Sequence, residues 1–199
     1  MKKYFVTGID TDSGKTVASA ILVEKLQADY WKPIQAGAPT DSDTIRSLVK
    51  GERKIHPEGI VLKAPMSPHA AAKLENINLN LTDIKMPSAE KTLVIEGAGG
   101  LMVPINDHEF VIDLAKQFEA EVILVSRNYL GSINHTMLSI DYLKSNGFDI
   151  AGIIFNDTPN PETESFILNH SNLPCLGRID AMPVIDKTSI QSQLQNITL

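Results

Sequence analysis

The sequence predicts a doubly wound α/β fold, in which a mostly parallel sheet carries helices on both faces. Three observations support this prediction: short apolar runs recur along the chain, helical patterns separate them, and a glycine-rich turn follows the first run. Runs that are apolar throughout are typical of strands buried on both faces. With 199 residues the chain is long enough for a sizeable core, so we expect residues 1–199 to form a single domain.

Six apolar runs are the candidate strands, at residues 4–7, 30–33, 92–95, 122–126, 150–155 and 175–179. They are far shorter than the ~20 residues that a membrane-spanning helix needs. Apolar side chains recur at helical spacing over residues 16–27 and 132–145, which predicts two helices between the strands. The second pattern stops at Asn146-Gly147, a helix stop signal.

The stretch from residue 38 to residue 90 is less regular than the rest. It contains five prolines and only short helical patterns, around residues 43–49 and 69–74. No second periodic core is visible in it, and no internal repeat or low-complexity tract occurs in the chain. We therefore expect an elaborated crossover between strands rather than a separate domain.

Composition excludes several classes of protein. Lys and Arg number 18 against 24 Asp and Glu, a formal charge of -6, whereas a general nucleic-acid binder needs clustered cations. Cys175 is the single cysteine and has no internal disulfide partner, so we expect a reduced, cytoplasmic protein. The five histidines show no metal-ligand spacing for a zinc site, and no G-x-S-x-G elbow indicates a hydrolase.

A phosphate-binding loop is the clearest motif. Residues 8–16 read G-I-D-T-D-S-G-K-T, which satisfies G-x-x-x-x-G-K-[ST] between a predicted strand and a predicted helix. Backbone N–H groups of such a loop converge on phosphate oxygens, and the helix N-terminus adds partial positive charge. Lys15 is expected to reach the β- and γ-phosphates, and the Thr16 hydroxyl to complete a Mg²⁺ shell. Asp10 and Asp12 are expected to point away from the phosphates or to serve metal binding or capping.

Two further strands end in charged residues, at the sheet edge where open α/β sheets bind ligands. Lys32 stands directly before Pro33 and is a candidate for stabilising phosphate charge, or else a solvated strand-end lysine. Glu96 precedes a glycine-rich turn and is a candidate Mg²⁺ ligand, or else an ordinary residue before a tight turn. The occurrence of both beside a phosphate loop favours the functional interpretations.

Two helix starts are also candidate sites. The segment D-S-D-T at residues 41–44 is suited to capping the helix that follows, and alternatively to supplying a second carboxylate to the metal. Residues 130–135, L-G-S-I-N-H, open another helix, whose free N–H groups are suited to a carboxylate, with capping by Ser132 as the alternative.

The combination resembles the dethiobiotin synthetase family over most of the chain. The segments that carry the resemblance are residues 8–16, K-P-I-Q-x-G at 32–37, Ser42-Asp43, Ser67-Pro68-His69, E-G-A-G-G at 96–100, L-G-x-x-N-H at 130–135 and Asn156-Asp157. The resemblance implies a fold of the P-loop NTPase type. It also implies an ATP-dependent ring closure in biotin synthesis, in which 7,8-diaminononanoate and CO₂ become dethiobiotin, with release of ADP and phosphate. One amine is carbamated, the carbamate takes the γ-phosphoryl group, and the second amine closes the cyclic urea.

The resemblance also implies roles for individual residues. Lys15, Lys32 and Thr11 would act at the reacting groups, and Thr16, Asp43 and Glu96 would hold Mg²⁺. The implied nucleotide site comprises Asp12, Ser13, Gly14, Lys15, Thr16, Val17, Asp43, Glu96, Gly97, Gly99, Asn156 and Asp157, with Asn156 reading adenine. The implied substrate site comprises Thr11, Lys32, Ala36, Leu130, Gly131 and Asn134. A homodimer is implied as well, in which the partner's helix start at Leu130 to Asn134 holds the substrate's tail carboxylate.

The sequence departs from the family pattern at a few positions. Ala36 stands where Ser or Thr is usual, which predicts the loss of one hydrogen bond to substrate, and Ser13 and Ile9 replace usual loop residues. The last strand is followed by Asp180 rather than proline. Two other functions stay open. A nucleotide switch of the ParA or MinD type is disfavoured because Ile9 follows Gly8, where many such ATPases carry a lysine. An amide ligase of the cobyrinate type is disfavoured because the chain is too short for the glutaminase domain that such enzymes carry.

Overall fold

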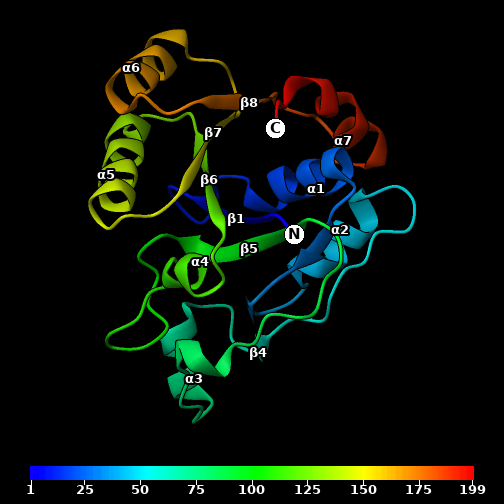
Figure 1. Cartoon of the computed structure of the whole chain (residues 1–199), viewed down its shortest axis with the longest axis vertical. Coiled ribbons are helices and arrows are strands. Elements are labelled where there is room, and N and C mark those ends of the chain that lie inside the picture. Colours follow the sequence, from blue (N-terminus) through cyan, green and yellow to red (C-terminus); the bar gives the residue numbers. More distant parts are fainter.

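The computed structural model describes residues 1–199 and is built around a six-stranded parallel sheet with strand order β2-β5-β1-β6-β7-β8 (Figure 1). The strands are β1 (Lys3–Gly8), β2 (Asp29–Trp31), β5 (Leu93–Gly100), β6 (Glu121–Arg127), β7 (Ile150–Asn156) and β8 (Cys175–Ile179). Each corresponds to one of the six predicted runs, and every pair is parallel. The predicted fold class is confirmed.

Helices cover both faces of this sheet, as predicted (Figure 1). On one face α1 (Lys15–Leu26), α2 (Asp41–Leu48) and α7 (Lys187–Gln193) pack into one apolar cluster. On the other, α3 (Pro68–Leu74), α4 (Asp113–Gln117), α5 (Ser132–Ser145) and α6 (Pro161–Ser171) contribute to a second cluster. Successive strand residues alternate between the clusters, so Tyr30 lies in the first and Trp31 in the second.

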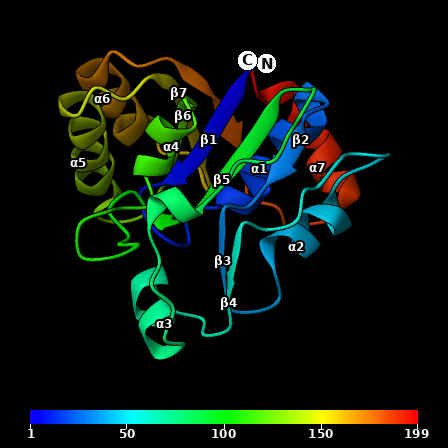
Figure 2. The same ribbon diagram turned by 60° about the horizontal axis from the view of Figure 1, so that its bottom comes forward.

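The irregular crossover forms a small second sheet. Strands β3 (Ile34–Ala36) and β4 (Ile60–Leu62) pair in parallel and, with α3, extend from the side of the molecule where β1 and β5 end (Figure 2). Ile34, Leu62 and Ala71 belong to the same apolar cluster as the main sheet, so this segment shares its core. The two strands have only three residues each, too few for the sequence pattern to mark them.

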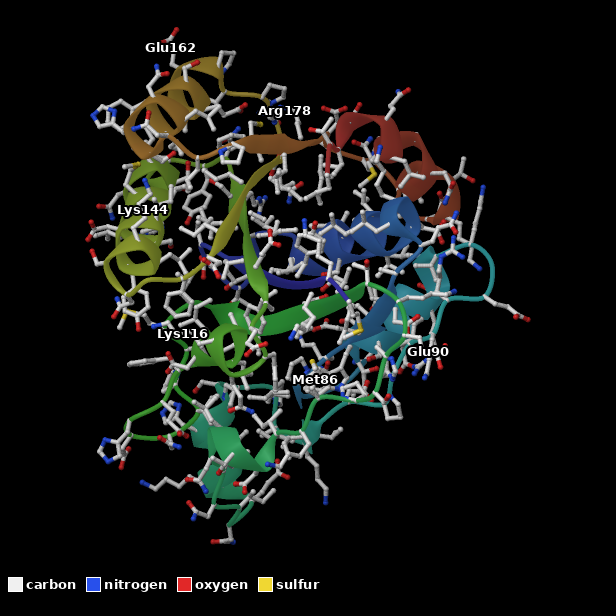
Figure 3. All side chains as sticks on the ribbon, in the orientation of Figure 1. Met86, Glu90, Lys116, Lys144, Glu162 and Arg178 are labelled. Atoms are coloured by element: carbon white, nitrogen blue, oxygen red, sulfur yellow. The ribbon has the colours of Figure 1, made fainter.

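The C-terminal part of the chain packs around β8, the last strand at this edge of the sheet. Lys144 on α5 donates a hydrogen bond to the Ser171 carbonyl at the end of α6, which joins these neighbouring helices (Figure 3). The chain then passes through β8 and α7 to the short 3-10 helix η2 (Leu194–Asn196), and Ile197 bridges back to Gly177 of β8. A second 3-10 helix, η1 (Leu81–Asp83), lies before β5. None of the helices combines the length and apolar character that crossing a membrane demands.

Candidate nucleotide and metal site

The phosphate loop joins β1 to α1 at the centre of the sheet. The helix N-cap is Gly14, with a φ of 94°, a left-handed conformation that favours glycine. A Cβ atom at Gly14 would also lie 2.1 Å from the Asn156 side-chain nitrogen, so a larger residue would displace the Asn156 side chain. The second glycine of the motif is therefore favoured by its backbone conformation, and it also leaves room for the Asn156 side chain.

Lys15 folds back beneath this loop. Its ammonium group donates to the carbonyl oxygens of Asp10, at 3.0 Å, and Thr11, at 2.9 Å. Burial lowers the pKa of Lys15 to about 8, although the nearby Glu96 carboxylate opposes that effect. The loop thus holds its cation by main-chain oxygens, beside the amides that the motif provides for phosphate.

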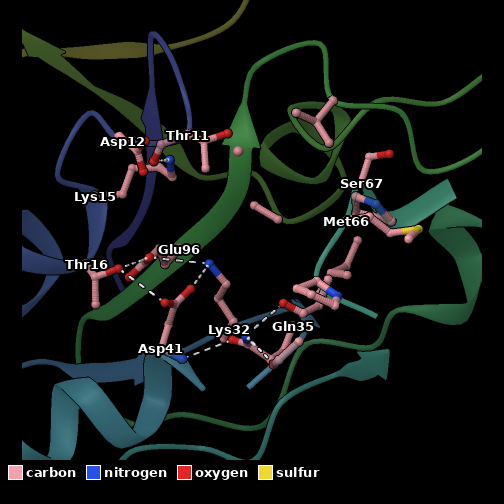
Figure 4. Close-up of a pocket in the computed structure, with 18 of the residues that line it drawn as sticks. Thr11, Asp12, Lys15, Thr16, Lys32, Gln35, Asp41, Met66, Ser67 and Glu96 are labelled. Atoms are coloured by element: carbon pink, nitrogen blue, oxygen red, sulfur yellow. Dashed lines mark hydrogen bonds and ion pairs between the residues drawn. The ribbon is translucent and has the colours of Figure 1, made fainter. Parts of the chain in front are cut away.

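A buried charge cluster lies next to the loop, around Glu96 in the middle of β5 (Figure 4). The glycine-rich turn that the sequence predicts after Glu96 is instead part of this strand, which continues to Gly100. Glu96 is 1% exposed, and its Oε1 atom accepts a 2.8 Å hydrogen bond from the Thr16 hydroxyl. The same oxygen lies 3.3 Å from the Lys32 ammonium. Thr16 also lies 3.4 Å from Asp41 Oδ1, so the hydroxyl bridges the two carboxylates. Three side-chain oxygen donors from three different elements converge here.

Lys32 is the counter-ion of this cluster. It is 3% exposed, which excludes the solvated strand-end interpretation. Its Nζ atom lies 2.6 Å from Asp41 Oδ2 and donates to the Gly97 carbonyl at 2.8 Å. Burial alone lowers the pKa of Lys32, but the Glu96 and Asp41 carboxylates outweigh burial and raise the pKa above its ordinary value. The lysine therefore carries its charge inside the site.

The carboxylate that α2 brings to this cluster belongs to Asp41, whereas Asp43, the predicted Mg²⁺ ligand, lies outside the cluster. Asp43 is exposed and pairs with Arg46 at 2.7 Å. Asp41 lies four residues before the buried Ile45 and hence on the inner face of α2, whereas Asp43 points outward. Thr40 caps the helix by accepting from the Asp43 N–H. The apolar spacing of α2 was the signal that distinguishes the two aspartates.

Gln35 fixes the loop that carries Asp41. Its side-chain carbonyl accepts from the Asp41 N–H at 3.0 Å, and its amide donates to the Gly37 carbonyl at 3.1 Å. Gln35 is buried, so these bonds are shielded from competing water. Sequence reasoning gave Gln35 no role, since nothing in K-P-I-Q-x-G distinguishes a ligand from a residue that holds a loop.

The oxygens of Thr16, Asp41 and Glu96 fit a magnesium ion. Mg²⁺ prefers hard oxygen donors and in phosphate sites takes one or two carboxylates, with phosphate oxygens and water completing its shell. The ammonium of Lys32 already shows that this pocket stabilises positive charge.

A cavity of about 710 Å³ opens above these groups. The phosphate-loop side contributes Thr11, Asp12, Gly14, Lys15, Thr16 and Val17, and Lys32, Glu96 and Gly99 lie beside them. Ala36, Met66 and Ser67 line the facing wall (Figure 4). Met66 and Ser67 were not predicted as site residues, although Ser67 belongs to a segment that carries the family resemblance. Cavities of this size commonly hold small-molecule ligands.

Ser13, another predicted nucleotide residue, does not line the cavity. It is buried within the loop, where its hydroxyl donates to the Asp10 carbonyl.

Asn156 and Asp157 lie at the end of β7. The Asn156 side-chain amide donates to the Ser13 carbonyl at 2.8 Å, and its oxygen accepts from the Asp157 N–H at 2.9 Å. Asp157 pairs outward with Arg127 at 2.7 Å, and this hydrogen bond lowers the pKa of the Asp157 carboxyl. Asn156 thus contacts the phosphate loop directly, although neither Asn156 nor Asp157 lines the cavity.

The predicted substrate residues at the start of α5 are not brought to this cavity within one chain. Leu130, Gly131 and Asn134 are exposed to solvent. Gly131, rather than Ser132, is the N-cap and makes no side-chain cap. A second hollow of about 330 Å³ lies between α5 and residues 100–103, and Thr11 lines both hollows.

Comparison with known proteins places the chain in a family. A family model described as an AAA domain matches residues 2–189 of the chain. ATP-dependent dethiobiotin synthetase from Cytophaga hutchinsonii is 52% identical, with 94% of this chain and 92% of that protein covered. The enzyme of the same name from Christiangramia forsetii is 51% identical, with 96% and 93% covered.

Solved structures agree on the fold. The septum site-determining protein MinD from Pyrococcus horikoshii superposes with a TM-score of 0.58 at 16% identity, with 99% of this chain and 86% of that chain covered. A ParA family ATPase from Chlorobium tepidum gives 0.52 at 14% identity, with 98% and 88% covered. At such low identity these likenesses bear on architecture alone, whereas the full-length relatives decide membership: the chain belongs to the ATP-dependent dethiobiotin synthetase family.

Proposed function

We propose that residues 1–199 form a single ligase domain that closes the cyclic urea of dethiobiotin from 7,8-diaminononanoate and CO₂, with hydrolysis of ATP to ADP and phosphate. The observation that carries this proposal is the convergence of the phosphate loop, Lys32 and the Glu96–Asp41 pair on one cavity. The family relationship supplies the reaction, and the cavity supplies groups that suit the charges of the phosphates, the metal and the carbamate.

The reaction needs positioning and charge stabilisation rather than a protein nucleophile. An amine of the substrate attacks CO₂ and forms a carbamate. A carbamate oxygen attacks the γ-phosphorus and ADP leaves; the second amine then attacks the carbonyl carbon, and phosphate leaves as the ring closes. Lys15 and Lys32 are suited to stabilise negative charge on the phosphoryl group and the carbamate.

We assign the magnesium ion to Thr16, Asp41 and Glu96, where it would neutralise charge on the phosphate oxygens. The nucleotide would lie along residues 12–17, with Gly97 and Gly99 near the phosphates and Asn156 beside the base. Thr11 would contact the diamine, since it lines both hollows. Ala36 on the facing wall offers substrate no side-chain hydrogen bond.

A homodimer is part of the proposal. Leu130 before α5 and Ile133 and Leu138 on it are exposed, and Leu138 lines the second hollow together with the exposed Met102. Apolar side chains gathered in this way favour a protein partner. In a dimer, the N–H groups of the partner's residues 131–134 would receive the substrate carboxylate.

We place the enzyme in the cytoplasm, in keeping with one free cysteine, Cys175.

ADP release measured with the diamine and bicarbonate, singly and together, tests the reaction. We expect release only when both are present, together with a dethiobiotin product of matching amount. The Lys15→Ala variant should lose at least about 100-fold in turnover, because one charge-stabilising donor typically accounts for that much. Its circular dichroism spectrum should stay unchanged. Release that ignores the diamine would contradict the ligase and favour a nucleotide switch.

A further inference from the structure

Tyr30 is a buried residue that contacts the charge cluster but does not line the cavity. It lies on β2, the neighbour of β5, where it is paired in register with Val94. Because strand side chains alternate between faces, Tyr30 and Glu96 point to the same side of the sheet. The Tyr30 hydroxyl donates to Glu96 Oε2 at 3.0 Å, and its side chain is fully buried.

The two oxygens of Glu96 therefore have different partners. Oε1 receives the Thr16 hydroxyl and lies near the Lys32 ammonium, at the cavity side. Oε2 receives the phenol of Tyr30 and no other donor. A buried carboxylate oxygen without a donor is unfavourable, so this hydrogen bond favours the orientation in which Oε1 is directed to Thr16.

We propose that Tyr30 is a positioning residue, whose hydroxyl holds Glu96 so that Oε1 is available to a divalent cation. The inference rests on the proposed function, because it deepens the role of Glu96 in that same site. Metal ligands are commonly oriented by hydrogen bonds from residues behind them, and loss of such a partner typically lowers metal affinity about 10- to 100-fold. Tyr30 stands in that place behind Glu96.

Tyr30→Phe removes the hydroxyl and little else. We expect the variant to bind Mn²⁺, used as the probe with ADP, at least about tenfold more weakly by electron paramagnetic resonance titration. The concentration of Mg²⁺ that gives half-maximal ligase rate should rise by a similar factor. The KM for the diamine should not change, because Tyr30 does not line the cavity.

Tyr4→Phe is the matched control. Tyr4 is buried in the same apolar cluster on the adjoining β1, and its hydroxyl makes no contact with Glu96. The change in chemistry is the same, so a general effect of removing a buried phenol hydroxyl would weaken Mn²⁺ binding in both variants. We expect the control to bind Mn²⁺ as the parent does.

A double-mutant cycle separates positioning from stability. In a Glu96→Gln background, Tyr30→Phe should cause no further loss of Mn²⁺ affinity, because the group that it orients is already altered. Mn²⁺ affinity within twofold of the parent in Tyr30→Phe, or additive losses in the cycle, would overturn the proposal. Since the Mn²⁺ titration needs neither diamine nor bicarbonate, failure of the ligase reaction would leave this test intact.

Discussion

At the scale of single residues, the site is held together by opposite charges in a buried place. Lys32 faces Asp41 and Glu96, and its raised pKa reflects how strongly these carboxylates favour the ammonium form. A buried pair of this kind contributes little net stability as a whole, yet removal of one partner leaves the others uncompensated. The lysine is therefore both a candidate catalytic cation and a structural counter-ion.

Lys32→Met tests the counter-ion role. Loss of one partner of a buried ion pair typically costs about 3–5 kcal/mol, so we expect a lower melting temperature. Because the two carboxylates then lack a cation, Mg²⁺ should raise the melting temperature of the variant more than that of the parent. Differential scanning calorimetry with and without Mg²⁺ measures this. Lys25→Met, an exposed lysine on α1, is the control, and equal Mg²⁺ shifts in all three proteins would contradict the assignment.

Asp41→Asn and Asp43→Asn test which aspartate serves the metal. The two residues lie in the first turn of the same helix, so helix effects are similar. We expect Asp41→Asn to weaken Mg²⁺ activation by at least about tenfold, since a carboxylate ligand becomes neutral. Asp43→Asn should leave the ligase rate and Mg²⁺ dependence as they are. The reverse pattern in steady-state kinetics would restore Asp43 as the ligand.

Sequence reasoning placed some residues of this cluster and missed others for physical reasons. Lys15 and Thr16 belong to a contiguous motif, and Lys32 and Glu96 stand at the ends of apolar runs, so their nearness at one side of the sheet could be predicted, although Glu96 lies within β5 rather than after it. Gln35 and Tyr30 act through contacts between segments that the sequence does not connect, whereas the apolar spacing of α2 could have distinguished Asp41 from Asp43. Which hydroxyl lies behind a carboxylate depends on strand order and register, and neither follows from a local pattern.

At the scale of elements, the phosphate loop is fastened to a strand far from it in sequence. Asn156 at the end of β7 donates to the Ser13 carbonyl and fills the space that glycine leaves at position 14. Each end of an asparagine amide has two hydrogen-bonding positions, and the structure uses one at each end. One donor and one acceptor are left over, so holding the loop and reading a base are compatible.

Asn156→Ala distinguishes these two roles. Loss of the contact with Ser13 should loosen the loop and raise the KM for any nucleoside triphosphate. Loss of a base contact should raise the KM for ATP and leave the KM for GTP unchanged. From the contacts present, we expect an increase of about fivefold or more for both nucleotides, the equivalent of about 1 kcal/mol for one hydrogen bond. Steady-state kinetics with each nucleotide measure this, and a change confined to ATP would contradict the loop-holding role.

The elements themselves were predicted unevenly. The six strands of the main sheet are apolar on both faces and stood out, although β2 ends at Trp31, two residues before the predicted end. Strands β3 and β4 and the helices α4, α6 and α7 were not predicted. A three-residue strand or a helix of five to seven residues presents too few positions for a period to show, and α6 was marked only by Asn160 and Pro161 at its start.

At the scale of the whole molecule, the proposed site is incomplete in one chain. The cavity contains groups for phosphate, metal and carbamate, but the predicted carboxylate-binding residues of α5 face solvent. Thr11 lines both the main cavity and the hollow beside α5, which places the two sites on either side of one loop residue. A second copy of the chain packed against α5 would cover the second hollow.

Leu138→Glu tests that assembly. Leu138 is exposed on α5 and lines the second hollow, so a buried charge there would oppose packing of a partner. We expect the parent to have about twice the chain mass of 21.8 kDa by size-exclusion chromatography with light scattering, and the variant to have the mass of one chain. Because the partner's α5 would then be missing, the KM for the diamine should rise at least about tenfold, while ADP binding by calorimetry stays the same.

Val61→Glu provides the control, since Val61 is exposed to a similar degree on β4, in the small second sheet. That variant should remain a dimer with parental kinetics. A Leu138→Glu protein that is monomeric and fully active would show that one chain encloses the diamine by itself. A parent that is already monomeric at the assay concentration would contradict the dimer. If the partner completes the site, dilution of the parent below its dissociation constant must lower the rate per chain, as Leu138→Glu does.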